Sequence, residues 1–175
     1  LICSFDKDSL PSNGTHCSYI SSILNKVEFN PDGFNIGICD TPLPLSSLRS
    51  SVLKAIDANT VCRFLSADCK NYTSLGIYKY VMTLVNNRII YDDIKSHIDI
   101  LKEYDNTYAS NLLDTLIVYI KNNGDISKTA SEIFQHTNTV RYRIKKACSL
   151  LCLSSEHAYE ELYLIINCYL LNKIL

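Results

Sequence analysis

The sequence predicts an α+β protein in which a small α/β domain precedes an all-helical domain. In the first third of the 175 residues, short apolar runs alternate with segments of helical periodicity. From about residue 72 onward, helical periodicity continues and no convincing strand follows. Hydrophobic residues make up 47% of the chain and charged residues 20%, a balance typical of a folded protein. We therefore place the domains at residues 1–73 and 74–175.

The first domain is expected to be a small layered structure of strands and helices. Short apolar runs predict strands at 1–5, 34–39 and 61–65. Apolar residues at helical spacing predict helices at 16–27 and beyond Pro44, the second with Ser46 or Ser47 as its N-cap. Strands and helices then alternate along the chain, as in other small α/β domains.

The second domain is expected to contain helices only. Apolar residues recur with helical periodicity in 74–87, 90–103, 108–122, 127–134, 138–151 and 157–174. Gly124 follows the third of these segments and is suited to the left-handed backbone that often closes a helix.

Two of these helices are joined by a short turn. Asp125 or Ser127 is a candidate N-cap for the first, and Thr137 or Asn138 for the second. We expect His136, which lies just before the second helix, to cap or pack and not to act in catalysis. Two helices with so short a connection predict a helix-turn-helix over residues 127–151.

The second helix is amphipathic, since consecutive residues are rotated by about 100°. The stripe expected to be buried consists of Val140, Ile144, Ala147 and Leu151. The side chains expected on the opposite face or beside it are Asn138, Thr139, Arg141, Tyr142, Lys145 and Lys146. Arg143 lies near the edge of the apolar stripe and is expected to form a structural ion pair, with Glu132 as one candidate partner.

Positive charge is concentrated around this helix. Residues 121–146 carry a formal charge of +4, whereas the other 149 residues carry −5. Amide, hydroxyl and cationic side chains suit base edges and phosphates in the DNA major groove. The candidate DNA contacts are Thr137, Asn138, Thr139, Arg141, Tyr142, Lys145 and Lys146. A solvated helix face is the alternative explanation of such a charge run.

The segment HTNTVRYRI lies within a longer stretch, residues 112–151, that resembles the C-terminal helix-turn-helix of the PucR/CdaR family of bacterial transcriptional regulators. The matching positions are His136, Asn138, Thr139, Val140, Arg141, Tyr142, Arg143 and Ile144, of which His136, Val140, Arg143 and Ile144 are expected to be structural. The resemblance extends over about residues 74–175. It implies a regulator of transcription that places the 138–151 helix in the major groove of double-stranded DNA. Because one such motif rarely gives enough specificity, we expect a homodimer on two half-sites about one helical turn apart. The expected location is cytoplasmic. The resemblance also implies a small-molecule effector, sensed by an N-terminal domain that is absent from this chain.

The front part is similar to the degenerate GGDEF-like domain that precedes this helix-turn-helix in many CdaR-type members. The similarity is carried by FNIGIC, PLSSLRSSVLKAI, VCRFL and SLGIYKYV. The chain has no GGDEF signature, so the resemblance implies a regulatory or dimerising domain without cyclase activity. A nucleotide-cyclase-like enzyme and an interaction module that does not bind DNA are the alternatives.

The sequence offers no convincing catalytic, metal or cofactor site. The eight cysteines form no CxxC pair and have no histidine at ligand spacing, so we expect reduced thiols that act as small core residues. No apolar run approaches the roughly 18 residues that span a bilayer, and no membrane association is expected. We therefore expect a protein that is not an enzyme and needs no cofactor.

Overall fold

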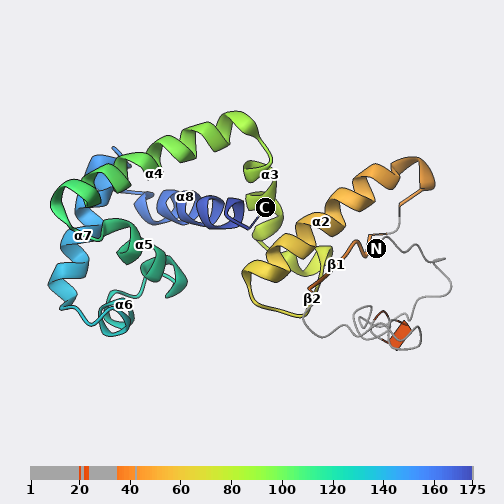
Figure 1. Ribbon diagram of the computed structural model, residues 1–175, viewed down its shortest axis with the longest axis horizontal. Coiled ribbons are helices and arrows are strands. Elements are labelled where there is room, and N and C mark those ends of the chain that lie inside the picture. The colour runs from red at the N-terminus through yellow and green to blue at the C-terminus, as the bar shows by residue number, and fades with distance from the viewer. Residues whose placement is uncertain (1–19, 21, 24–34, 42, 175) are drawn as a thin grey trace. The chain divides into compact units, whose positions relative to one another are not determined.

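The computed structural model describes residues 20, 22–23, 35–41 and 43–174 (Figure 1). The strand predicted at 1–5 and most of the helix predicted at 16–27 lie outside these residues. The chain divides into two compact units, Leu1–Met82 with Ile174–Leu175, and Thr83–Lys173. The described part is mostly helical with one small sheet, as expected for an α+β chain with a helix-turn-helix. None of the described helices is long and apolar enough to cross a membrane.

The described part of the first unit is built around two short parallel strands. Strand β1 (Ile36–Ile38) pairs with β2 (Cys69–Asn71), and helix α2 (Leu48–Phe64) connects them after the 3-10 turn η2 (Leu45–Ser47). Parallel strands require such a crossover because a tight hairpin can join only antiparallel ones. β1 lies so close to α2 that a Cβ atom at Gly37 would overlap the Ala55 carbonyl oxygen and the Asn59 nitrogen.

The strand predicted at 61–65 is wrong. Val61 and Cys62 are fully buried, but they belong to the last turns of α2, and the next strand is β2. A short apolar run has the same pattern in a buried helix as in a buried strand, and here the helical hydrogen bonds continue to Phe64. Ser66, with φ of 51°, then turns the chain toward β2.

The described cysteines differ in oxidation state. Cys39, Cys62, Cys148, Cys152 and Cys168 are free thiols, and burial raises the pKa of Cys168 to about 11. Cys69 is disulfide-bonded, so the prediction of reduced thiols is wrong at that position.

The helix predicted at 74–87 is interrupted. A 3-10 turn, η3 (Tyr72–Leu75), comes first, and helix α3 covers only Tyr78–Val85. Gly76 lies between them with φ of 58°, a left-handed conformation that a helix cannot include. The Asp40 carboxylate accepts a hydrogen bond from the Thr73 backbone N–H at 3.0 Å and so fixes η3 near the end of β1.

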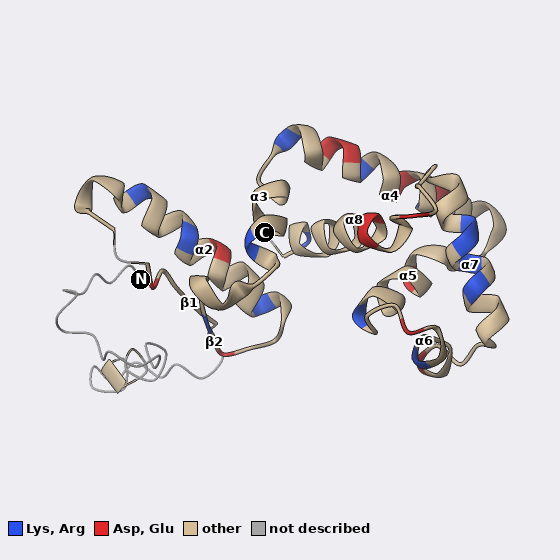
Figure 2. Cartoon of the chain, turned by 180° about the vertical axis from the view of Figure 1, so that it is seen from behind, with Lys and Arg blue, Asp and Glu red and all other residues tan. Residues whose placement is uncertain are grey.

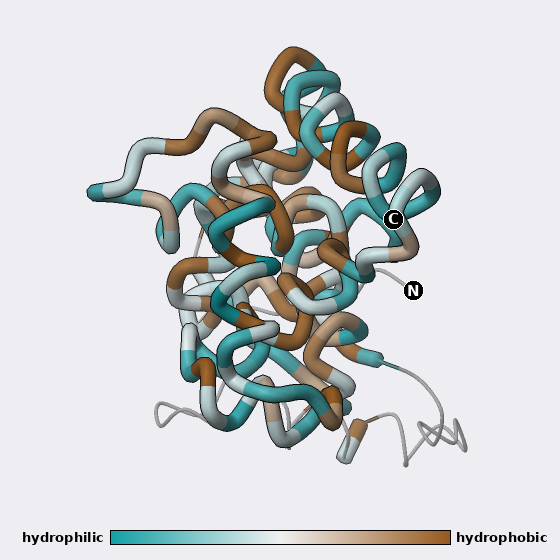
Figure 3. The backbone as a smooth tube through the Cα atoms, turned by 90° about the vertical axis from the view of Figure 1, so that its left-hand side faces the viewer, coloured by the Kyte–Doolittle hydropathy of each residue, from teal (hydrophilic) through white to brown (hydrophobic). Residues whose placement is uncertain are grey.

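The second unit is a bundle of five described helices. They are α4 (Arg88–Tyr108), α5 (Leu112–Lys121), α6 (Ile126–Glu132), α7 (Thr137–Leu150) and α8 (Ala158–Asn172). Figure 3 shows hydrophobic and hydrophilic residues alternating along the helical turns of the backbone, as expected for amphipathic helices. Their buried core includes Ile98, Leu101, Leu112, Leu116, Ile120, Val140, Ala147, Leu162, Ile166 and Leu171.

The chain reverses direction between α4 and α5 at residues 109–111. The sequence predicts a helix over 108–122, but α5 begins only at Leu112. Ala109 and Asn111 have positive φ, which ends one helix before the next begins. The Asp105 carboxylate accepts hydrogen bonds from the backbone N–H groups of Leu112 and Leu113, at 2.6 and 3.0 Å. A residue of α4 thus caps α5 and holds the two helices together.

The end of α5 has the left-handed residue that the sequence predicts. Gly124 has φ of 79° and donates its N–H to the Tyr119 carbonyl oxygen at 2.9 Å, which satisfies one of the last carbonyls of the helix. A Cβ at Gly124 would also lie 2.9 Å from the Tyr159 ring. Both observations explain why a glycine stands here.

Candidate nucleic-acid interface

Helices α6 and α7 form a helix–turn–helix pair. The Asp125 carboxylate accepts a hydrogen bond from the Lys128 backbone N–H at 2.9 Å and caps α6. The turn contains Phe134, which has φ of 54° and a side chain that is 92% exposed. Helix α7 then begins at Thr137, one residue earlier than predicted.

The N-cap of α7 is His136 and not Thr137 or Asn138. Its Nδ1 accepts a hydrogen bond from the Asn138 backbone N–H at 3.2 Å. Thr137 is the first residue of the helix and Asn138 the second, so neither is in position to cap. The expected backbone-capping role of His136 matches this geometry.

The apolar side of α7 faces the bundle. Val140 and Ala147 are fully buried and Leu151 is nearly so, whereas Ile144 is half-buried. Helices α5 and α6 pack against α7 and provide the surface on which this stripe rests. The packing fixes which side of α7 faces outward.

The polar side of α7 is open. Asn138, Arg141, Tyr142 and Lys145 are exposed, with 61% of Tyr142 accessible. Figure 2 shows Lys and Arg along this helix. The Arg141 guanidinium donates to the Asn138 side-chain oxygen at 3.2 Å, so the two groups lie together in the first turns. The remaining predicted contacts, Thr137, Thr139 and Lys146, are half-buried.

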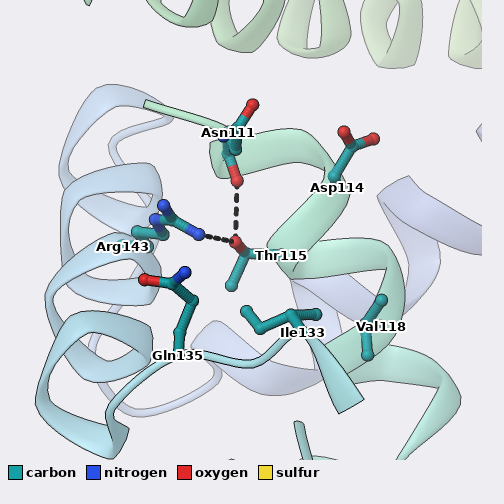
Figure 4. Close-up of a pocket in the computed structure, with 7 residues that line it drawn as sticks. All are labelled: Asn111, Asp114, Thr115, Val118, Ile133, Gln135 and Arg143. Atoms are coloured by element: carbon teal, nitrogen blue, oxygen red, sulfur yellow. Dashed lines mark hydrogen bonds between the residues drawn. The ribbon is translucent and has the colours of Figure 1, made fainter. Parts of the chain in front are cut away.

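Arg143 has a different partner from the one predicted. Its guanidinium donates to the Thr115 hydroxyl of α5 at 3.0 Å, and that hydroxyl donates in turn to the Asn111 carbonyl oxygen at 2.7 Å (Figure 4). Thr115 is buried, so the contact lies between helices and away from the open face. Arg143 therefore joins α7 to α5.

Glu132, the suggested partner of Arg143, is engaged elsewhere. Its carboxylate accepts hydrogen bonds from Asn122 at 2.8 Å and from Lys121 at 3.0 Å. These bonds, with Asn122 as the larger contributor, hold the pKa of Glu132 below its usual value. They connect the end of α5 to the end of α6.

Arg143 borders a cavity of about 270 Å³ that lies between α5, α7 and the turn before α7. The lining residues, shown in Figure 4, are Asn111, Asp114, Thr115, Val118, Ile133, Gln135 and Arg143. No group of His, Cys, Asp and Glu side chains in the described part of the chain is arranged to hold a metal ion.

One residue of α4, Tyr104, adjoins α7, and Tyr108 packs against it; sequence reasoning missed both. The Lys146 ammonium lies 4.9 Å from the centroid of the Tyr104 ring. The Tyr108 ring centroid is 4.5 Å from that of Tyr104. Desolvation, followed by the interaction with Tyr142, raises the pKa of Tyr104. The available signal was two tyrosines at i and i+4, which lie on one helix face.

These features define a helix-turn-helix domain: two helices joined by a short turn, the second with a buried apolar stripe and an open amide-rich and cationic face. Residues 112–167 match the PucR C-terminal helix-turn-helix domain. For these residues, the resemblance that the sequence predicts is confirmed.

Two known regulators are similar to the chain. The proline-responsive transcriptional activator PutR of Bacillus subtilis (strain 168) is 25% identical over 179 residues, which cover 99% of this chain and 43% of PutR. The DNA-binding transcriptional activator AdeR of the same organism is 28% identical over 76 residues, 43% of this chain and 18% of AdeR. The chain thus spans less than half the length of these relatives. No solved structure matches it.

Proposed function

We propose that this chain acts as a DNA-binding regulator of transcription of the PucR type, with α7 as the recognition helix in the major groove. The observation that carries the proposal is the open face of α7, where Asn138, Arg141, Tyr142 and Lys145 are exposed while Val140 and Ala147 are buried beneath them. The PucR-type match over residues 112–167 and the similarity to two transcriptional activators support the same function.

The chemistry of this face suits a division of roles along α7. Asn138 and Arg141 lie in the first turns, the part of a recognition helix that usually meets base edges. An amide can pair with adenine and a guanidinium with guanine. Lys145 and Lys146 lie one to two turns later, where we assign them to phosphates, and Thr137, Thr139 and Tyr142 to the groove wall.

We also propose that the protein works as a homodimer. One recognition helix covers only a few base pairs, so two copies on half-sites about one helical turn apart would give the required specificity. The parallel βαβ arrangement of β1, α2 and β2 is compatible with a degenerate GGDEF-like regulatory or dimerising domain in the first unit. We assign effector sensing to a further domain, which would bind a small metabolite and would lie N-terminal to this chain.

The first prediction concerns Lys145. Lys145→Ala should lower the slope of log affinity against log salt by about one unit, because one phosphate contact is lost. The Tyr142→Ala/Lys145→Ala double variant should weaken binding at least tenfold. Fluorescence anisotropy on sequences selected from a random DNA pool, at four salt concentrations, measures both effects.

Lys95→Ala is the matched control, because Lys95 is an exposed lysine of α4 in the same unit. It should leave the salt slope unchanged. If the double variant binds the selected DNA as tightly as the parent chain does, α7 is not the recognition helix. If the parent chain selects no sequence at all, an interaction module that does not bind DNA becomes the better hypothesis.

A further inference from the structure

The end of α4 contacts Lys146 of the proposed recognition face, although α4 is not part of the helix–turn–helix pair. The Tyr104 ring lies under the Lys146 ammonium, with 4.9 Å between the nitrogen and the ring centroid. Tyr108, one helical turn further, packs its ring against that of Tyr104, with 4.5 Å between the ring centroids. An aromatic side chain of α4 therefore meets a cationic group of α7.

The contact leaves the charge of Lys146 available. A ring face attracts an ammonium group without neutralising it, whereas a carboxylate would cancel its charge. Within the described residues, no carboxylate lies at ion-pair distance from Lys146. The nearby Asp105 carboxylate is occupied by the N–H groups of Leu112 and Leu113. Lys146 is thus a cation whose direction is set and whose charge remains free to meet an anion.

The rotamer freedom of the Lys146 side chain before binding affects how much the residue contributes to DNA affinity. A lysine on a solvated helix samples many rotamers and loses that freedom when it contacts a phosphate. A lysine already held against a ring loses less on binding, so the contact is stronger for the same geometry.

We propose that Tyr104 is a positioning residue of the DNA interface, which directs Lys146 toward a backbone phosphate. The proposal rests on the proposed function, since it deepens the role of the same face. It extends the interface from the helix-turn-helix to the end of α4, so that an interhelical aromatic contact contributes to DNA affinity without itself touching DNA.

A double-mutant cycle tests the proposal. Lys146→Met should lower the salt slope by about 0.9 units. Tyr104→Leu, which removes the ring, should weaken DNA binding about three- to tenfold and lower the slope in the same direction. The Tyr104→Leu/Lys146→Met double variant should bind no more weakly than the weaker single variant, because both substitutions remove one contact.

Two further variants separate positioning from loss of structure. Tyr169→Leu removes a tyrosine that packs under Lys102, at 5.2 Å, in the same unit, and it should leave both DNA affinity and salt slope unchanged. Thermal unfolding identifies any variant that fails to fold. If Tyr104→Leu fails to fold, Tyr104→Met replaces it in the cycle, since methionine also removes the ring and fills a similar volume.

The outcomes distinguish the inference from the proposed function. Additive effects of ring removal at Tyr104 and of Lys146→Met would overturn the inference. Tighter binding by Tyr104→Leu would also overturn it, because Tyr104 would then withdraw Lys146 from DNA. If Lys146→Met leaves the slope unchanged while Lys145→Ala lowers it, the inference fails and the proposed function stands. If no substitution on α7 alters binding, both fail.

Discussion

Arg141 and Arg143 lie two residues apart on α7 and have different surroundings. Arg141 is exposed and donates to Asn138 on the open face, whereas Arg143 is half-buried and donates to Thr115 of α5. Residues two positions apart on a helix are rotated by about 200° about its axis, so their side chains point in nearly opposite directions. One arginine can therefore face solvent while the other packs against a neighbouring helix. Residue type alone does not decide the role.

This difference yields a prediction for the two arginines. Arg143→Met keeps the apolar stem but removes the guanidinium, and we expect it to lower the free energy of unfolding by about 1–2 kcal/mol, since a charged hydrogen bond to a buried hydroxyl is lost. Arg141→Met should change stability by less than about 0.5 kcal/mol and weaken DNA binding. Urea denaturation and anisotropy on the same preparations measure both. If Arg141→Met lowered stability and Arg143→Met weakened only DNA binding, the roles assigned to the two arginines would be reversed.

At the scale of the element, α7 depends on its first turn. The helix begins where His136 accepts the Asn138 N–H, next to the exposed Phe134 turn. An uncapped end would fray first in the residues that we assign to base contacts, Asn138 and Arg141. The cap therefore affects both the stability of the helix and the geometry of the proposed interface.

His136→Ala should lower stability by about 1 kcal/mol, because one N–H of the first turn loses its acceptor. His136→Asn is the matched variant, since asparagine is a strong N-cap and should restore most of the loss. Thermal unfolding of the two variants against the parent chain measures the difference. Equal stability of all three chains would show that the hydrogen bond to Asn138 is not needed.

The elements also show which predictions depend on local sequence. Gly124 has the predicted positive φ, and α4 to α8 lie close to the predicted segments, because strong amphipathic periodicity over several turns has few alternatives. The run at 61–65 was too short to distinguish a strand from the end of a helix. Its position in α2 depends on packing against β1 and β2, which lie elsewhere in the sequence.

At the scale of the whole molecule, the chain divides into two compact units, and the described part of each contains buried apolar residues. The first depends on the close approach of β1 to α2 at Gly37, where an added Cβ would overlap backbone atoms of α2. Backbone atoms cannot move aside as the end of a flexible side chain can. The second unit contains the helix-turn-helix and its own apolar core.

Gly37→Ala should therefore destabilise the first unit by about 3 kcal/mol, at the upper end for a single substitution. Hydrogen exchange should become faster across β1, α2 and β2 and change little across residues 112–151. Gly76→Ala is the control: its φ of 58° is unfavourable for alanine, but no atom lies within 4 Å of the added Cβ, so about 1 kcal/mol is expected. Equal costs for the two variants would show that the close approach is unimportant.

The sequence by itself determined the amphipathic character of α7, the helix-turn-helix and the concentration of positive charge, since each depends on residues near one another in the chain. Only the tertiary structure decided that Arg143 joins Thr115, that Glu132 joins Asn122 and Lys121, and that Tyr104 lies under Lys146. Periodicity states which side of a helix is apolar, because rotation per residue is constant. It does not state which side chain of another helix meets that surface, because the partner is selected by packing between segments that are distant in the sequence.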